Sequence, residues 1–232
     1  MPSLYWSVAA LPSVEALPAL RAGLEAAFPT EEGRAYLDEL VVSAATGRSL
    51  PPRVALARLF GLSLLPPLLA RAGIDASRLR LWRDEHGRPY AVLDGAGAPP
   101  FDFNVSHADG HAACALLVGG GRVGVDVEEP IPPRRALPLV RRYCTEGELR
   151  LLQGRSDDEI ADDFTRIWTI REALCKQDGR GMPLRFDATR IPDGLAITTM
   201  RRGSGGTRIT LCYPLGTEVL MGDDASDGLR TL

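Results

Sequence analysis

The stretch Phe101–Glu128, with the sequence FDFNVSHADGHAACALLVGGGRVGVDVE, decides the fold class of this 232-residue chain. The segments FDFNVSH and AACALLV are short, largely apolar and bounded by turn-forming residues, which is typical of β-strands. The three glycines Gly119–Gly121 predict a hairpin turn, and RVGVDVE predicts the strand that returns from it. The centre of the chain is therefore expected to be β-structure.

The chain before this stretch looks mainly helical. The arrangement of apolar and polar residues within Arg53–Gly73 predicts one or two buried helices. This segment is apolar, but Pro66 and Pro67 split it, so we interpret it as core rather than as a membrane span. The exception is Arg78–Leu93, whose alternating pattern predicts a β-hairpin that turns at His86–Gly87.

The chain after this stretch predicts a loop, helices and two closing strands. Prolines interrupt the basic segment Ile131–Tyr143, which we expect to be a loop. The alternating segments Gly194–Met200 and Thr207–Leu215 predict a closing pair of strands. Because helices and hairpins are mixed without a repeated strand–helix–strand order, the fold class is expected to be α+β.

Two helices have clear boundary signals. Thr145 and Glu148 have the spacing of a capping box at the start of a short helix. A longer helix is expected from Asp157 or the next residue as far as Lys176. Gly179 follows at the position where a glycine commonly takes the left-handed conformation that ends a helix.

The composition is that of an ordinary soluble protein, with 45% hydrophobic and 25% charged residues. The net charge of −3 argues against general nucleic-acid binding, which needs a basic surface. The four cysteines are far apart and form no CxxC pair, so we expect reduced thiols in a cytoplasmic protein rather than a zinc site. The first residues lack the basic start of a signal peptide.

The segment VGVDVE indicates a cation site. On a strand, alternate side chains share a face, so Asp126 and Glu128 are expected side by side, opposite the valines. Two carboxylates that close repel each other unless a cation lies between them, and magnesium prefers such oxygen ligands. The alternative is an exposed strand end before a proline.

The long helix carries a second set of candidate residues. Trp168, Glu172 and Lys176 are four residues apart and form one stripe, with the tryptophan expected to line a groove. Lys176 is the only lysine, since every other basic residue except histidine is arginine. A compact ammonium suits contact with a phosphate or a leaving oxygen, although a surface Glu–Lys pair is the simpler alternative.

Three further residues could hold a phosphate. Ser106 and His107 end a predicted strand, and Arg88 lies in a predicted turn. Taken singly, His107 is an ordinary loop histidine and Arg88 an ordinary turn arginine. The sequence has no GxxxxGK[ST] loop, no dinucleotide-binding glycine pattern and no GxSxG motif, which excludes those enzyme classes.

The order of these motifs resembles the Sfp-type 4′-phosphopantetheinyl transferases. The motifs are GRP at Gly87–Pro89, FNVSH at Phe103–His107, VGVDVEEP at Val123–Pro130, WTIREALCK at Trp168–Lys176 and GRG at Gly179–Gly181. The similarity runs from about residue 80 to residue 181, and the first 75 residues match poorly. The resemblance implies two pseudo-symmetric α/β lobes, expected at residues 1–121 and 122–232, with the active site between them.

The resemblance also implies roles for the candidate residues. Asp126, Glu128 and Glu172 would bind magnesium, with manganese as an alternative ion, and Lys176 would lie beside the pyrophosphate of coenzyme A. Ser106, His107 and Arg88 would contact the adenosine 3′-phosphate, and Arg53 is the one basic residue we can add from the N-terminal region. Glu148 matches an acidic position near the metal site. Arg171 departs from the family pattern, which has a lysine there, but any basic residue should serve.

The implied reaction transfers the 4′-phosphopantetheine group of coenzyme A to a serine of an apo acyl or peptidyl carrier protein and releases 3′,5′-ADP. Glu172, directly or through water, would accept the serine proton, and Lys176 would stabilise the leaving group. The basic segment Ile131–Tyr143 is a candidate docking site for an acidic carrier, or else a solvated loop. We expect a monomer without nucleic-acid or membrane partners. The alternatives are another magnesium-dependent phosphoryl-transfer enzyme, a non-catalytic homologue that binds coenzyme A or a carrier, and a purely structural protein.

Overall fold

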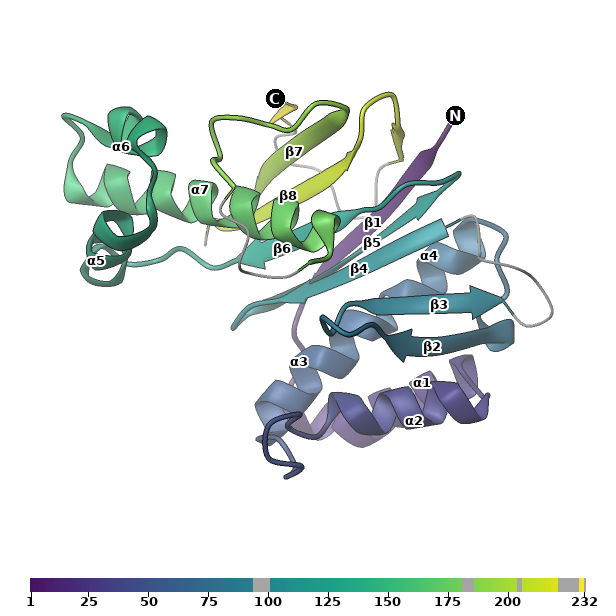
Figure 1. The fold of residues 1–232 in the computed structure, drawn as a ribbon. Helices are drawn as coiled ribbons and strands as arrows, with labels where there is room; N and C mark the ends of the chain where they lie inside the picture. The colour runs from purple at the N-terminus through teal and green to yellow at the C-terminus, as the bar shows by residue number, and fades with distance from the viewer. Residues whose placement is uncertain (94–100, 181–185, 204–205, 221–229, 232) are drawn as a thin grey trace.

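The computed structural model describes residues 1–93, 101–180, 186–203, 206–220 and 230–231. It confirms the α+β fold class, with helices grouped around two four-stranded sheets and one two-stranded hairpin (Figure 1). The N-terminal half contains β1 (Ser3–Ala10), α1 (Leu17–Ala27), α2 (Glu31–Leu40), α3 (Pro52–Ser63), α4 (Leu65–Arg71), β2 (Leu79–Arg83), β3 (Pro89–Leu93), β4 (Phe101–His107) and β5 (His111–Val118). The C-terminal half contains β6 (Gly124–Glu128), α5 (Pro133–Tyr143), α6 (Glu146–Leu152), α7 (Asp157–Asp178), β7 (Leu195–Arg202), β8 (Thr207–Pro214), β9 (Glu218–Leu220) and β10 (Arg230–Thr231).

The two larger sheets repeat one topology. Their strand orders are β4-β5-β1-β9 and β10-β7-β8-β6. In each half the first strand, β1 or β6, pairs antiparallel with the last long strand, β5 or β8, and that strand pairs antiparallel with β4 or β7. The short β9 belongs to the C-terminal half but pairs parallel with β1, so the C-terminal half contributes one strand to the N-terminal sheet.

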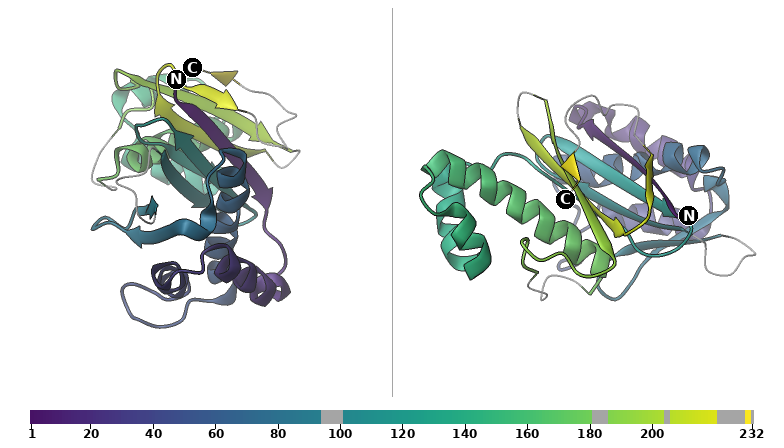
Figure 2. Two further views of the ribbon diagram at one scale, coloured as in Figure 1. Left: turned by 90° about the vertical axis from the view of Figure 1, so that its right-hand side faces the viewer. Right: turned by 90° about the horizontal axis from the view of Figure 1, so that it is seen from above.

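The core lies on both faces of the N-terminal sheet. Because side chains alternate along a strand, Cys114 and Leu116 of β5 face the helices α1 to α4, whereas Ala113 and Leu117 face the C-terminal sheet. Figure 2 shows the helices α1 and α2 on the side of the molecule opposite β7 and β8. The expected division at residue 121 therefore runs through a shared hydrophobic core.

Several predicted elements are confirmed. The segment Arg53–Gly73 forms the two helices α3 and α4, whose leucines lie in the core beneath the N-terminal sheet. The stretch Pro52–Arg71 is long and apolar enough to cross a membrane by length and composition alone, but half of it is buried inside the protein. The hairpin β2–β3 turns at Gly87, which has a φ of 80°.

The predicted helix boundaries are also confirmed. Thr145 and Glu148 form a reciprocal capping box at the start of α6. The helix α7 begins at Asp157 after its N-cap Ser156, which makes a second capping box with Glu159. Gly179 ends α7 in the left-handed conformation with a φ of 85°.

Three sequence-based expectations are wrong. The first residues are not helical but form β1, because burial alternates along Leu4, Trp6 and Val8. The segment Ile131–Tyr143 is not a loop but contains the helix α5, which tolerates the internal Pro138 because Ala136 and Val140 are buried against the rest of the C-terminal half. Finally, the glycines Gly119–Gly121 do not close a hairpin.

The strand that follows the three glycines leaves the N-terminal sheet and pairs with β8. All three glycines have positive φ angles, which allow this change of direction. The free edge of β6 then lies along β4, where side chains of every second β4 residue accept its amide protons. These hydrogen bonds are Val123 N to Asp102 Oδ2 at 2.7 Å, Val125 N to Asn104 Oδ1 at 3.0 Å and Val127 N to Ser106 Oγ at 3.3 Å. We call this contact the β4–β6 seam.

Candidate active site

The site forms where α7 lies directly on β6, and Gly124 permits this close approach. A Cβ atom at Gly124 would lie 2.0 Å from the carbonyl oxygen of Ala173 and 2.6 Å from the amide nitrogen of Gln177. Both distances are far below van der Waals contact. Only a residue without a side chain therefore lets the C-terminal half of α7 reach the strand that carries Asp126 and Glu128.

The ammonium of Lys176 joins three elements of the fold. Its Nζ donates to Asp126 Oδ1 on β6 at 2.7 Å and to Ser106 Oγ on β4 at 2.8 Å. The Ser106 hydroxyl itself donates to Asp126 Oδ1 at 2.9 Å. Asp126 and Ser106 are both buried, whereas the Lys176 side chain is partly exposed. The single lysine thus connects α7 with both strands of the β4–β6 seam.

Three carboxylates share this region, and each has a raised pKa. Burial, followed by the carboxylate of Asp126, raises the pKa of Glu128 to about 7. The same two causes raise the pKa of Glu172. Burial also raises the pKa of Asp126, while the Lys176 ammonium acts in the opposite direction. The cluster therefore has more negative charge than one ammonium compensates.

The donor set fits a hard divalent cation. Asp126 Oδ2 is buried and has no hydrogen-bond partner within the described part of the chain, so one carboxylate oxygen is left free at the cluster. Carboxylate oxygens are the ligands that such ions prefer. Among the described residues no three His, Cys, Asp or Glu side chains are arranged as a ready-made metal site. The cation that Asp126 contacts in this structure is Lys176.

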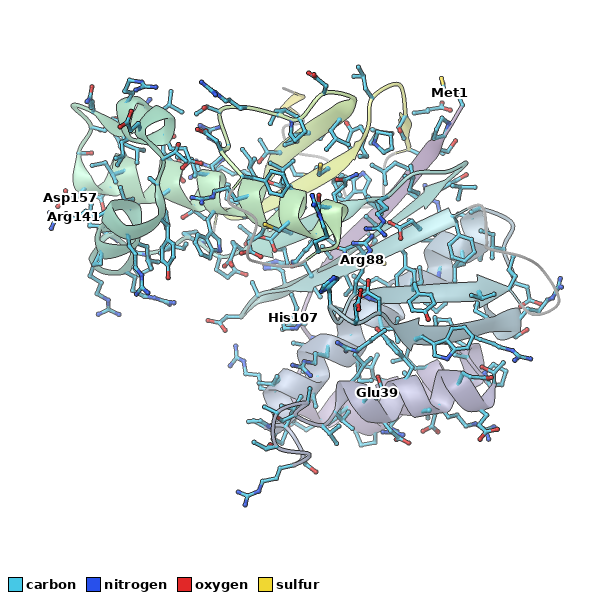
Figure 3. The ribbon with its side chains drawn as sticks, in the orientation of Figure 1. Met1, Glu39, Arg88, His107, Arg141 and Asp157 are labelled. Carbon is cyan, nitrogen blue, oxygen red and sulfur yellow. The ribbon has the colours of Figure 1, made fainter. Side chains whose placement is uncertain are left out.

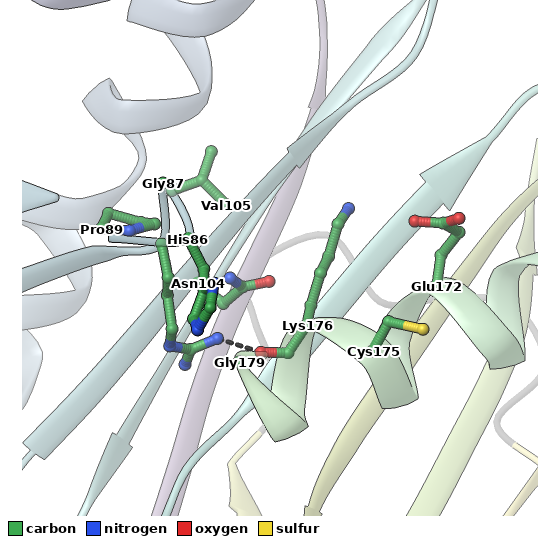
Figure 4. Close-up of a pocket in the computed structure, with 10 residues that line it drawn as sticks. His86, Gly87, Pro89, Asn104, Val105, Glu172, Cys175, Lys176 and Gly179 are labelled. Carbon is green, nitrogen blue, oxygen red and sulfur yellow. Dashed lines mark hydrogen bonds between the residues drawn. The ribbon is translucent and has the colours of Figure 1, made fainter. Parts of the chain in front are cut away.

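A cavity of about 250 Å³ opens beside these residues (Figure 4). Glu172 and Lys176 line it from α7, Asn104 lines it from β4, and the turn from His86 to Pro89 closes one side. Figure 4 shows Glu172 and Lys176 projecting from the same side of α7. Trp168 was expected to line a groove, but it does not line this cavity. Its ring packs against Tyr143 and Phe164 instead.

A second cavity of about 250 Å³ adjoins the first, and Gly87, Pro89 and Val105 line both. His107 lies in the second cavity, since consecutive residues of β4 face opposite sides. Desolvation and the cations Lys176 and Arg58 lower the pKa of His107, which favours the neutral imidazole. An anion bound there would reverse the effect of the cations.

The sequence analysis missed the two arginines of this second cavity, Arg58 and Arg83. Arg58 comes from α3, and burial and the Arg83 guanidinium lower its pKa. Arg83 itself lies 3.8 Å from the carboxylate of Glu39. Within the described residues no hydrogen bond or ion pair holds the Arg58 guanidinium. The sequence did contain a signal for Arg58: it is a basic residue within an otherwise apolar and buried helix.

Arg88 and Arg53, the other two predicted phosphate contacts, both bind protein atoms in this structure. Arg88 lines the first cavity and lies between the β2–β3 hairpin and the end of α7 (Figure 3). Its guanidinium donates to Lys176 O, Asp102 and Val123 O. Arg53 does not join the others: it donates to Asp109 O and lines a different cavity at the start of α3.

Glu148 and Arg171 support the structure around α6 and line neither of the two cavities described above. Glu148 is fully buried, accepts from the amides of Thr145 and Ala188, and lies 3.4 Å from the guanidinium of Arg171. Arg171 also donates to Tyr143 O at 2.7 Å. The last residue of the predicted motifs, Gly181, lies outside the described residues.

The fold and the site define a class: a protein of two α+β halves in which a carboxylate cluster and one ammonium lie beside a cavity at the seam between the halves. The sequence model of the 4′-phosphopantetheinyl transferase superfamily matches residues 122–212. The 4′-phosphopantetheinyl transferase AcpT of Salmonella typhimurium is 32% identical over 141 residues, which cover 57% of this chain and 72% of the relative. The chain belongs to the 4′-phosphopantetheinyl transferase superfamily.

Two relatives from Bacillus subtilis show how far the similarity extends. A 4′-phosphopantetheinyl transferase is 29% identical over 134 residues, covering 57% of this chain and 56% of the relative. The 4′-phosphopantetheinyl transferase Sfp is 30% identical over 118 residues, covering 51% and 49%. The chain thus spans about half the length of these curated relatives.

Proposed function

We propose that this protein transfers the 4′-phosphopantetheine group of coenzyme A to a serine of an apo acyl or peptidyl carrier protein. The observation that carries the proposal is the contact of the Lys176 ammonium with Asp126, 2.7 Å apart, in a carboxylate cluster beside a cavity. A site of this kind suits a pyrophosphate ester, which needs both a cation and acid–base groups. The family membership of the chain supports the same activity.

In the proposed reaction the serine oxygen of the carrier attacks the phosphorus that bears the pantetheine. A new oxygen–phosphorus bond forms as the bond to the bridging pyrophosphate oxygen breaks, and 3′,5′-ADP leaves. Glu172 accepts the serine proton, a role that its raised pKa supports. The ammonium of Lys176 lies where it can stabilise the charge that develops on the leaving group.

We propose that Asp126, Glu128 and Glu172 hold a divalent cation, magnesium before manganese. Two observations support this assignment: burial and the Asp126 carboxylate raise the pKa values of Glu128 and Glu172, and Oδ2 of Asp126 is free. When bound, the ion would act as a Lewis acid on the pyrophosphate.

The second cavity is our candidate for the 3′-phosphate of coenzyme A. His107, Arg58 and Arg83 line it, and the lowered pKa values of His107 and Arg58 support an anion as its natural occupant. Arg58 and Arg83 replace Arg53 in this assignment, because Arg53 lines a separate cavity.

The proposed activity is tested by mass spectrometry of an intact apo carrier protein incubated with this protein, coenzyme A and magnesium. The expected result is a mass gain of one phosphopantetheine that is lost when the metal is chelated. If several unrelated apo carriers gain no mass while coenzyme A still binds, the protein is a binding homologue or another phosphoryl-transfer enzyme. Absence of both transfer and coenzyme A binding contradicts the proposal entirely.

The helix α5 is our candidate docking site for the carrier. Arg134, Arg135, Arg141 and Arg142 are exposed on it, and it packs near the start of α7 (Figure 1). Arg135 lowers the pKa of Glu128, so one end of α5 lies within electrostatic reach of the carboxylate cluster. An acidic carrier bound there would have its serine close to the site.

Reversing the charge of Arg134, Arg141 and Arg142 to glutamate is expected to raise the KM for the carrier about tenfold, because these rim charges steer association. The KM for coenzyme A should stay unchanged, since these residues line neither cavity. Steady-state kinetics with each substrate varied in turn measure both constants. Arg34→Glu, exposed on α2 in the other half, is the matched control. An unchanged carrier KM contradicts docking on α5.

We also propose that the protein works in a reducing compartment such as the cytoplasm. The four cysteines are free, and Cys114, Cys175 and Cys212 are buried. Burial raises the pKa of the Cys114 thiol, which keeps it protonated and unreactive.

A further inference from the structure

Arg88 is attached to the last turn of α7. Its Nη1 donates to the carbonyl oxygen of Lys176, and its Nη2 donates to Asp102 and, at 2.9 Å, to Val123 O. The Arg88 side chain is only 8% exposed. Three of the five guanidinium N–H groups thus have protein acceptors, and these contacts fix the position of Arg88 against the end of α7.

The backbone of Arg88 is also held by hydrogen bonds. The carboxylate of Asp84 accepts from the amides of His86 and Arg88, both at 2.9 Å, and the amide of Asp84 donates to Arg88 O. These bonds fix the turn of the β2–β3 hairpin. The hairpin therefore presents Arg88 to α7 from a rigid support.

Lys176 is consequently held at two points. Arg88 holds its backbone carbonyl, and Asp126 and Ser106 hold its ammonium. Asp102, which holds Arg88, and Ser106 lie on the same face of β4. The β4–β6 seam thus sets both the position of the helix end and the position of the ammonium. Arg122, which donates to Asp178 O, adds a second contact at the same helix end.

We propose that Arg88 is a positioning residue that acts through Lys176. With Asp102, it holds the last turn of α7 on the β4–β6 seam so that the ammonium faces Asp126. This inference deepens the proposed transferase activity and rests on it for its kinetic consequences. The structural attachment of α7 stands independently of that activity.

The variant Asp102→Asn distinguishes this role from phosphate binding. Asparagine can still accept from the amide of Val123 but loses the charge that holds Arg88. If Arg88 positions α7, Asp102→Asn and Arg88→Ala impair the protein in the same direction. If Arg88 binds phosphate, removal of its anionic partner frees it, and Asp102→Asn keeps or improves the affinity for coenzyme A.

The test combines kinetics with hydrogen exchange on the full chain. Arg88→Ala and Asp102→Asn are each expected to lower kcat about tenfold or more, and the double variant should add little, because the residues act as one unit. Amides of residues 175–179 should exchange about tenfold faster in both variants, while amides of α5 keep their wild-type rates. Arg88→Lys, which keeps the charge but not the fork, should be intermediate. Arg80→Ala, on the same hairpin but directed to Glu32, is the control.

Two outcomes overturn the inference. One is a loss of coenzyme A affinity in Arg88→Ala with unchanged exchange at the end of α7. The other is wild-type or better affinity and kcat in Asp102→Asn. If the wild-type protein neither transfers phosphopantetheine nor binds coenzyme A, the proposed function fails, and the exchange rates alone still decide whether Arg88 holds α7.

Discussion

Replacement of Lys176 by alanine is expected to lower kcat for phosphopantetheine transfer about 100- to 1000-fold, the loss typical when one preorganised charge donor is removed from an active site. The ammonium donates to Asp126 and Ser106 and lies beside the cavity. Among the described residues, no other basic side chain forms an ion pair with Asp126, so none can replace it. The KM for the carrier protein should change little. Single-turnover kinetics with the mass-spectrometric readout measure the effect.

Lys176→Arg is expected to be strongly impaired as well. A guanidinium is larger and forked, and the space between Asp126 and Ser106 accommodates one compact nitrogen at 2.7 and 2.8 Å. Arg166→Ala, on the same helix with only a loose 4.0 Å pair to Asp163, is the control and should remain active. Full turnover by Lys176→Ala would show that the ammonium has no chemical role.

Replacement of Gly124 by alanine is expected to have the largest effect on stability. The added Cβ would lie 2.0 Å from Ala173 O, and the atoms it meets are backbone, which cannot rotate away. Either α7 lifts from β6 or the strand shifts, at a cost of about 3 kcal/mol or more in the free energy of unfolding. Chemical denaturation monitored by circular dichroism measures this loss.

The same variant should lose activity even where it remains folded. Displacement of α7 by about 1 Å would separate Glu172 and Lys176 from Asp126, and a shift of that size costs about a hundredfold in rate. Gly23→Ala is the matched control, because a Cβ at Gly23 in α1 meets nothing within 4 Å. It should be as stable as wild type or more so. Wild-type stability of Gly124→Ala would contradict the close packing of α7 on β6.

Features that depend on nearby residues could be read from the sequence. The capping box of Thr145 and Glu148, the end of α7 at Gly179 and the hairpin around Gly87 follow from local backbone preferences. The alternation in VGVDVE correctly assigned the valines to the hydrophobic core and Asp126 to the other face of the strand, where it meets Lys176. Glu172 and Lys176 could be assigned to one helix face because a helix has a fixed period.

Features that depend on distant residues could not be predicted from the sequence. Nothing local to Gly119–Gly121 indicates that the next strand pairs with β8, whose residues lie more than 80 positions later. The burial that keeps Ile131–Tyr143 helical despite Pro138 likewise comes from packing against the rest of the C-terminal half. The roles of Arg88 and Arg58 also required the structure, because an arginine that bonds protein carbonyls looks the same in sequence as one that faces a cavity.

By itself, the sequence determined the fold class, the helices α3, α4, α6 and α7, the β2–β3 hairpin, the order of the family motifs and the residue types that the site needs. Periodicity, capping and motif spacing are local properties, and the chain carries them in any environment. Only the tertiary structure decided that α7 reaches β6 across Gly124, that β4 side chains bind the amides of β6, and that Lys176 meets Asp126. These contacts join segments far apart in the chain, and their geometry is set by the packing of two sheets around one core.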